Sequence, residues 1–228
     1  MYTSHDRLII FDADGTTVDA FSAIDATFAR HGMDLGDLES FQKRRRLFKY
    51  LGGIRDLPAI LVNRFGAQSR KALLDTLTEI YREEAALYPG IAELFLTLIG
   101  TPDIRIGLVT RNVTNEAELT LKRLFARHGV DLDALDFIIR IPVGDDKSAH
   151  FKRMRERFDI NPARSYTCGD EHHDYAAAIA SGMQPFIVSY GFEDHERLTE
   201  QFGIPEMLIS TTPDTVCRRI RHAFDLPD

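Results

Sequence analysis

Cysteine is scarce in this sequence and tryptophan is absent. Cys168 and Cys217 are the two cysteines among 228 residues, so a disulfide framework is excluded and we expect a reduced, cytoplasmic setting. Long apolar runs are also missing, since none approaches the roughly 20 residues that a membrane-spanning helix needs. The charged Asp6 and Arg7 precede only a short apolar run, which is unlike a signal peptide. We therefore expect neither a disulfide-rich secreted domain nor a membrane partner.

Positive charge is in the minority. The chain has 28 Lys and Arg against 35 Asp and Glu, a net charge of −7 at pH 7, which argues against a general nucleic-acid surface. Apolar residues make up 44% of the chain and charged residues 28%, as is usual for a globular protein. The length suits one large domain, or a core domain with an insertion. Composition leaves the oligomeric state open.

The segment 8–19, LIIFDADGTTVD, joins an apolar run to two carboxylates. A short apolar run bounded by turn residues is typical of a buried strand in a parallel sheet. Asp12 and Asp14 then lie at its carboxyl end, where open α/β sheets bind their ligands. Because residues two apart on a strand point the same way, both carboxylates can face one centre. Gly15 permits a tight turn there. The same residue pattern would also occur where a strand simply ends in a polar loop.

Beyond Gly90 the pattern alternates between strand and helix. Apolar runs predict strands at residues 104–110, 137–141, 165–168, 186–189 and 207–210. Helical spacing predicts helices between them, with Asn115 and Glu118 as a capping box, Ser148 as a cap and Thr212-Pro213 as a start. This order favours a doubly wound, Rossmann-like parallel α/β sheet with right-handed crossovers.

Residues 20–87 read as a helical module inserted after the first strand. Nothing in this span alternates like a strand, and Pro89-Gly90 marks its exit. The expected division is therefore an α/β core formed by residues 1–19 and 88–228 around an insertion at 20–87. The expected helix faces contain Phe21, Ile24 and Phe28; Leu38, Phe41, Arg45 and Phe48; a segment from 57 to 65; and Leu73, Leu77, Ile80 and Leu87.

Polar side chains follow several of the expected strands. Asp12 and Asp14 follow the first, Thr110 ends the strand at 104–110, and Lys147 follows the strand at 137–141. The strand at 165–168 leads into GDEHHD at residues 169–174. Because the carboxyl ends of parallel strands share one edge of a sheet, these acids, the hydroxyl and the cation are expected to converge.

Four carboxylates in one pocket would repel one another. Two unit charges about 4 Å apart interact by roughly 4 kcal/mol at an effective dielectric near 20, so Asp12, Asp14, Asp170 and Asp174 need a cation. Clustered oxygen ligands select a hard ion, most simply Mg²⁺. Together with Lys147, this ion can neutralise a bound phosphate. A carboxylate can then act as the nucleophile of phosphoryl transfer, with Asp14 as general acid and base.

The motifs together resemble those of the haloacid dehalogenase superfamily. DADGT at residues 12–16, Thr110 after an apolar strand, Lys147 and GDEHHD at 169–174 match its four motifs in order and spacing. The insertion lies between the first two motifs, where the phosphoglycolate-phosphatase-like branch has a helical cap. YPGIAEL at 88–94 is similar to that branch's return from cap to core. The resemblance implies an α/β core with a helical cap over residues 20–87.

The resemblance also implies roles for the two acids of the first motif. Asp12 is implied to be the nucleophile and a Mg²⁺ ligand. Asp14 is implied to be the general acid and base, and its backbone carbonyl to bind the metal. Dehalogenases have no acid at the position of Asp14, and phosphonatases usually have alanine there. The implied reaction is therefore hydrolysis of a small phosphomonoester.

The other motifs complete the implied site. Thr110 and Lys147 are implied to hold the phosphate, Asp170 to ligate the metal, and Asp174 to support the metal directly or indirectly. The second motif departs from the family pattern, because Arg111 stands where Asn is common. Arg111 is therefore a candidate phosphate contact, or a residue that faces solvent.

Two other functions remain possible at this point. A phosphomutase would move phosphate between positions of one sugar, and would give an isomer instead of free phosphate. A regulator that senses a phosphorylated ligand without turnover would hydrolyse no generic aryl phosphate. Retention of every motif residue argues against the regulator.

Three further features have ordinary explanations beside functional ones. The basic run 43–46, with Arg45 as its best candidate, could capture a second anionic group, but a solvated helix face is the commoner case. His172 and His173 lack a full set of metal ligands around them. Cys168 is expected to be a buried strand residue.

Overall fold

The structure is a computed structural model that describes residues 2, 4–34, 36–42, 67–142 and 144–227. Its centre is a six-stranded sheet with the strand order β3-β2-β1-β4-β5-β6, in which every neighbouring pair is parallel. The strands are β1 (Arg7–Phe11), β2 (Ile104–Thr110), β3 (Phe137–Arg140), β4 (Ser165–Gly169), β5 (Gln184–Val188) and β6 (Ile209–Ser210). The doubly wound α/β prediction is confirmed. The chain order reverses beside β1, where such folds place their ligands.

Helices cover both faces of the sheet. They are α5 (Ile91–Ile99), α6 (Ala117–Arg127), α7 (Ser148–Arg157), α8 (His172–Ser181) and α9 (Pro213–Ala223), with short helical turns at Leu132–Ala134, Pro162–Arg164, Arg197–Gln201 and Glu206–Leu208. Side chains alternate along β1, so Ile9 and Phe11 pack into one apolar cluster and Leu8 and Ile10 into another. The first cluster contains side chains of α5, α6 and α9, and the second those of α7 and α8. Burial on both faces explains why residues 8–11 are all apolar.

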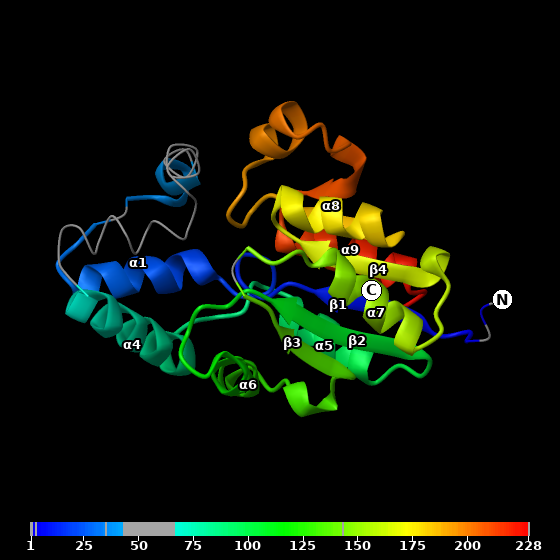
Figure 1. The fold of residues 1–228 in the computed structure, drawn as a ribbon, viewed down its shortest axis with the longest axis horizontal. Helices are drawn as coiled ribbons and strands as arrows, with labels where there is room; N and C mark the ends of the chain where they lie inside the picture. Colours follow the sequence, from blue (N-terminus) through cyan, green and yellow to red (C-terminus); the bar gives the residue numbers. More distant parts are fainter. Residues whose placement is uncertain (1, 3, 35, 43–66, 143, 228) are drawn as a thin grey trace.

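Two long helices of the inserted segment are described, α1 (Ala20–Arg30) and α4 (Ala67–Glu83). They pack side by side at the end of the molecule opposite to the N-terminus (Figure 1). Asp19 caps α1, because its carboxylate accepts from the Ser22 backbone N–H at 3.1 Å. The expected helix faces at Arg45 and Phe48 and at 57–65, and the basic run 43–46, lie outside the described residues. The division into core and cap stays a prediction.

The expected capping box at Asn115 and Glu118 is wrong. Helix α6 begins at Ala117 and its N-cap is Glu116, whose φ is 48°. The Asn115 backbone N–H is instead satisfied by the Thr78 hydroxyl of α4 at 2.9 Å. A tertiary contact has therefore replaced the local one that the spacing suggested.

Of the two other expected helix starts, the cap at Ser148 is wrong and the start at Thr212-Pro213 is confirmed. Ser148 is the first residue of α7 rather than its cap, because its backbone N–H donates to Asp146 Oδ1 at 2.9 Å. Thr212 does cap α9, accepting from the Thr215 backbone N–H at 3.2 Å, with Pro213 in the first turn. Among the described residues, no helix is both long and apolar enough to cross a membrane.

Candidate active site

The turn after β1 places Asp12 and Asp14 at the carboxyl edge of the sheet. The Asp12 backbone N–H donates to the Cys168 carbonyl at 2.9 Å, which continues the pairing with β4. The Ala13 carbonyl then accepts from three successive backbone N–H groups, and Gly15 has a φ of 81°. The chain thus turns sharply directly after the strand and leaves both carboxylates at its end.

Lys147 lies between Asp12 and Asp174. Its Nζ is 2.8 Å from Asp12 Oδ2 and 2.6 Å from Asp174 Oδ1, and its side chain is 1% exposed. Burial by itself lowers the pKa of Lys147, but the two carboxylates outweigh it and raise the pKa above its ordinary value. Lys147 therefore keeps its positive charge beside Asp12. Its contacts also bring together residues that follow different strands, as the sequence predicts.

Three carboxylates form one cluster beside this lysine. One oxygen each of Asp12, Asp170 and Asp174 lie within 4.8 Å of one another. Asp170 is fully buried and accepts from the Phe192 backbone N–H at 2.7 Å and from the Thr16 hydroxyl at 3.2 Å. Burial, and then neighbouring acids, raise the pKa of Asp170 well above its usual range. Burial also raises the pKa of Asp12, against the opposing effect of Lys147. Lys147 therefore does not balance the cluster alone.

A hard divalent cation fits this set of donors. The three closest groups are carboxylate oxygens, and the raised pKa values of Asp12 and Asp170 indicate that the pocket favours additional positive charge. His172 does not belong to the cluster, because its Nδ1 lies 3.0 Å from Glu193 Oε1. Its backbone N–H also donates to Glu193 Oε2 at 2.6 Å, at the start of α8. The donor set therefore suits Mg²⁺ better than a histidine-selective metal.

Asp14 has a different environment from Asp12. Its Oδ1 accepts from the Tyr81 hydroxyl of α4 at 2.9 Å and from Asn112 Nδ2 at 2.9 Å. Its Oδ2 accepts from Asn112 Nδ2 at 3.1 Å. Burial raises the pKa of Asp14, and the two neutral donors oppose that shift. A raised pKa suits a carboxyl group that gives and takes a proton near neutral pH.

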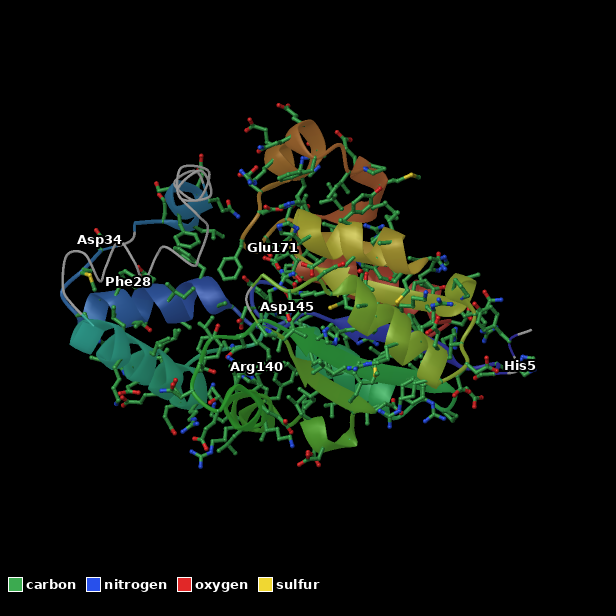
Figure 2. All side chains as sticks on the ribbon, viewed as in Figure 1. His5, Phe28, Asp34, Arg140, Asp145 and Glu171 are labelled. Atoms are coloured by element: carbon green, nitrogen blue, oxygen red, sulfur yellow. The ribbon has the colours of Figure 1, made fainter. Side chains whose placement is uncertain are left out.

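Thr110 and Arg111 lie at the end of β2. The buried Thr110 hydroxyl accepts from the Asn112 backbone N–H at 3.1 Å, which leaves its own hydrogen to donate to a ligand. Arg111 donates to the Asp145 carbonyl at 2.7 Å and lies 3.5 Å from Glu171 Oε2. Figure 2 shows Asp145 and Glu171 at the end of the sheet nearest to α1. Arg111 thus joins two loops at the rim of the site, and its contact with phosphate stays a prediction.

Sequence reasoning missed several residues of this site. Tyr81 and the amide of Asn112 hold Asp14, and the loop after β5 supports Asp170 through Phe192. Close packing surrounds Asp170 as well, because a Cβ added to Gly15 or Gly191 would lie 2.3 or 2.5 Å from its Oδ2. The one available signal was that Tyr81 lies four residues after Leu77, which places a polar tip on the buried face of α4.

Comparisons with known proteins agree with this geometry. The family model of haloacid dehalogenase-like hydrolases matches residues 9–188. A phosphoglycolate phosphatase of Synechococcus elongatus is 25% identical over 215 residues, which cover 91% of this chain and 94% of that protein. Phosphoglycolate phosphatase 1 of Pseudomonas aeruginosa is 25% identical over an alignment of 243 residues, covering 97% and 83%. A Thermotoga maritima structure described as a beta-phosphoglucomutase shares the fold, with a TM-score of 0.67 at 18% identity and coverage of 95% and 99%.

Proposed function

Since this chain belongs to the haloacid dehalogenase-like hydrolase family, we propose that it is a Mg²⁺-dependent phosphatase acting on a small phosphomonoester through an Asp12 phosphate. The observation that carries the proposal is the pairing of two unlike carboxylates at the end of β1. Asp12 lies 2.8 Å from a buried ammonium, and Asp14 accepts from a phenol and an amide. A charged nucleophile and a proton donor are the two parts that this hydrolysis needs.

In the first step, a carboxylate oxygen of Asp12 forms a bond to phosphorus. The ester P–O bond breaks, and its electron pair goes to the leaving oxygen. That oxygen takes a proton from the carboxyl group of Asp14. The products of the step are a free alcohol and an acyl phosphate on Asp12.

In the second step, a water oxygen forms a bond to phosphorus. Asp14, now ionised, accepts a proton from that water. The bond between phosphorus and Asp12 breaks, inorganic phosphate leaves, and the Asp12 carboxylate is restored. Asp14 thus returns to its protonated form, and the site is ready for another ester.

Positive charge and hydrogen-bond donors would hold the phosphoryl group during both steps. We assign this role to Lys147, the Thr110 hydroxyl and Arg111. Lys147 is already charged and desolvated beside the nucleophile, so it costs little reorganisation when charge builds on the phosphoryl oxygens.

Mg²⁺ would be held by Asp12, Asp170 and the backbone carbonyl of Asp14, with Asp174 as a direct or supporting partner. When bound, the ion neutralises the acid cluster and the charge of the phosphoryl group. Without such a cation, burial and then the neighbouring acids keep the pKa values of Asp12 and Asp170 high, which weakens the nucleophile. The fit of the donor set supports this assignment.

The relatives named above are phosphoglycolate phosphatases, so phosphoglycolate is the first substrate to test. A small anionic ester also suits a site bordered by Lys147 and Arg111. The proposal includes a cytoplasmic location and a cap formed by residues 20–87 that closes over the site and excludes water during the first step.

The test is a panel of phosphomonoesters that includes phosphoglycolate, sugar phosphates and an aryl phosphate. Phosphate release should require Mg²⁺, stop with a chelator and resume when Mg²⁺ is restored. Isomers formed from a sugar phosphate without free phosphate would identify a mutase. No release from any ester, the aryl phosphate included, would favour a regulator that senses phosphorylated ligands.

A further inference from the structure

Tyr81 is a buried tyrosine outside the four motifs, and its hydroxyl touches one of the proposed reacting groups. Its side chain is 2% exposed, and its hydroxyl donates to Asp14 Oδ1 at 2.9 Å. We propose that Tyr81 is a positioning residue that fixes Asp14 Oδ1, so that Oδ2 is the oxygen that gives its proton to the leaving group. This inference rests on the proposed phosphatase function.

The orientation of the second donor to Asp14 is settled by its own partners. The Oδ1 of Asn112 accepts from the Thr114 backbone N–H at 3.0 Å and from the Thr114 hydroxyl. A backbone N–H can only donate, so the amide oxygen of Asn112 must face Thr114 and its NH₂ group must face Asp14. Asp14 Oδ1 therefore receives two hydrogen bonds of 2.9 Å, while Oδ2 receives the longer one of 3.1 Å.

The asymmetry between the two oxygens decides which of them carries the proton. An oxygen that accepts two hydrogen bonds is stabilised with its negative charge, so protonation falls on the other oxygen. Removing the Tyr81 hydroxyl would make the two oxygens nearly equivalent and would let the carboxyl group rotate. The proton would then be misplaced in part of the molecules.

Tyr81 is held firmly because its helix is bonded to the segment that follows β2. The Thr78 hydroxyl accepts from the Asn115 backbone N–H at 2.9 Å, and Asn115 Nδ2 donates to Asp75 at 2.8 Å. Arg82 donates to the Thr120 hydroxyl at 3.0 Å and pairs with Glu116 at 3.0 Å. The two donors to Asp14 therefore come from elements that are bonded to each other. On α4 these bonds are made one to six residues away from Tyr81, and on the other side they are made by the segment that follows Asn112.

The phenol stays a donor throughout. Burial and the nearby charge of Asp14 raise the pKa of Tyr81 well above its ordinary value, so the hydroxyl keeps its hydrogen. Its role is then to orient Asp14 and not to transfer a proton itself.

This role has a signature that simple structural support does not have. A general acid matters when the leaving oxygen is strongly basic, as in an alkyl phosphate, and matters little when the leaving group is a stable nitrophenolate. A variant with a misplaced acid should therefore lose activity in proportion to the basicity of the leaving group. A variant with a distorted phosphate or metal site should lose activity on all esters alike.

The experiment compares Tyr81→Phe with the wild type in the presence of Mg²⁺. We would measure kcat/KM for an alkyl phosphate, phenyl phosphate and a nitrophenyl phosphate, because kcat/KM reports the step that forms the Asp12 phosphate. The expected loss is about tenfold or more on the alkyl ester, which is part of the roughly 10²- to 10⁴-fold that a general acid contributes, and close to none on the nitrophenyl ester. Asn112→Ser removes the other donor and should steepen the dependence in the same direction.

Tyr166→Phe is the matched control. Tyr166 lies near the amino end of β4, at the opposite end of the sheet, where its ring packs against Phe186 and Phe224. This variant makes the same chemical change and should behave like the wild type. Thermal unfolding of each variant shows that it is folded.

Equal loss on all three esters in Tyr81→Phe, or no loss on any of them, would overturn the inference alone. A wild-type protein that releases phosphate from none of the esters would overturn the proposed function and this inference with it. The two failures are therefore distinguishable in the same set of assays.

Discussion

Asp12 and Asp14 are two residues apart at the end of one strand, yet their carboxylates have opposite surroundings. Asp12 lies beside the Lys147 ammonium and two further acids. Asp14 lies beside a phenol and an amide, which are neutral donors. The ordinary pKa of the two groups is the same, so the partners alone separate them. These surroundings match the separate roles that we propose, with Asp12 as a charged nucleophile and Asp14 as a carboxyl group that gives and takes a proton.

The two carboxylates are also supported by different elements of the fold. The charged side is supported by the loop after β5, whose Phe192 backbone N–H donates to Asp170, and by the turn after β1, whose Thr16 hydroxyl donates to the same carboxylate. The neutral side is supported by α4, which belongs to the inserted segment. The comparison therefore predicts that changes on the two sides have different kinetic consequences.

The largest effect is expected for Asp12→Asn. An amide is a poor nucleophile, so the covalent step is lost and turnover should fall by about 10⁴-fold or more on every ester. The fold should survive, because the side chains have nearly the same shape. Phosphate release and a thermal melt measure the two properties. Substantial remaining activity would refute the covalent proposal.

Asp14→Asn sharpens the comparison from the neutral side. The variant cannot supply a proton, so an alkyl phosphate should react about 10²- to 10⁴-fold more slowly. A nitrophenyl phosphate should lose much less in kcat/KM, whereas Asp12→Asn treats both esters alike. If the two variants showed the same dependence on the leaving group, the two acids would not have separate roles.

The smallest expected effect is on stability, and it is predicted for a residue that supports the charged side of the site. The buried carboxylate of Glu193 accepts from the His172 backbone N–H at 2.6 Å and pairs with Arg197 at 3.2 Å. Burial favours its neutral form, but hydrogen bonds from His172 and the charge of His172 lower the pKa of Glu193 below the usual 4.5. Glu193→Gln should therefore lower the free energy of unfolding by about 1–3 kcal/mol at neutral pH.

The pH dependence of this effect has a definite sign. A carboxyl group with a lowered folded pKa stabilises the protein above its unfolded pKa, and this contribution disappears as the pH falls through the folded value. The gap between Glu193→Gln and the wild type in urea unfolding should thus be full near pH 7 and shrink below about pH 4.5. A gap that stays constant over that range would show that the charge of Glu193 does not stabilise the fold.

Much of the fold and of the charged side could be predicted from the sequence. The apolar run 8–11 requires burial on both faces, and that requires a parallel sheet with helices on each side. Once the sheet is parallel, Asp12, Lys147 and Asp170 have to meet at its carboxyl edge, whatever their separation along the chain. The argument depends on topology and not on the details of packing.

The neutral side could not be predicted in this way. The contact between Tyr81 and Asp14 depends on how α4 packs beside the segment after β2, and periodicity gives the buried face of a helix but not its partner. The same packing explains why the predicted capping box at Asn115 and Glu118 is wrong, since Asn115 is hydrogen-bonded to Thr78 and Asp75 of α4. The capping pattern failed at this point because α4, which is distant in the sequence, makes the hydrogen bonds that the pattern assigns to neighbouring residues.

The attachment of α4 to the segment after β2 has a practical consequence for building chimeras. A foreign cap spliced in place of residues 20–87 would discard Thr78, Tyr81 and Arg82, and with them the hydrogen bonds to Asp14, Asn115 and Thr120. A graft whose second junction lies within α4, ahead of Asp75, would keep these hydrogen bonds in the recipient protein. Specificity could then be exchanged while the proton-transfer machinery remained native.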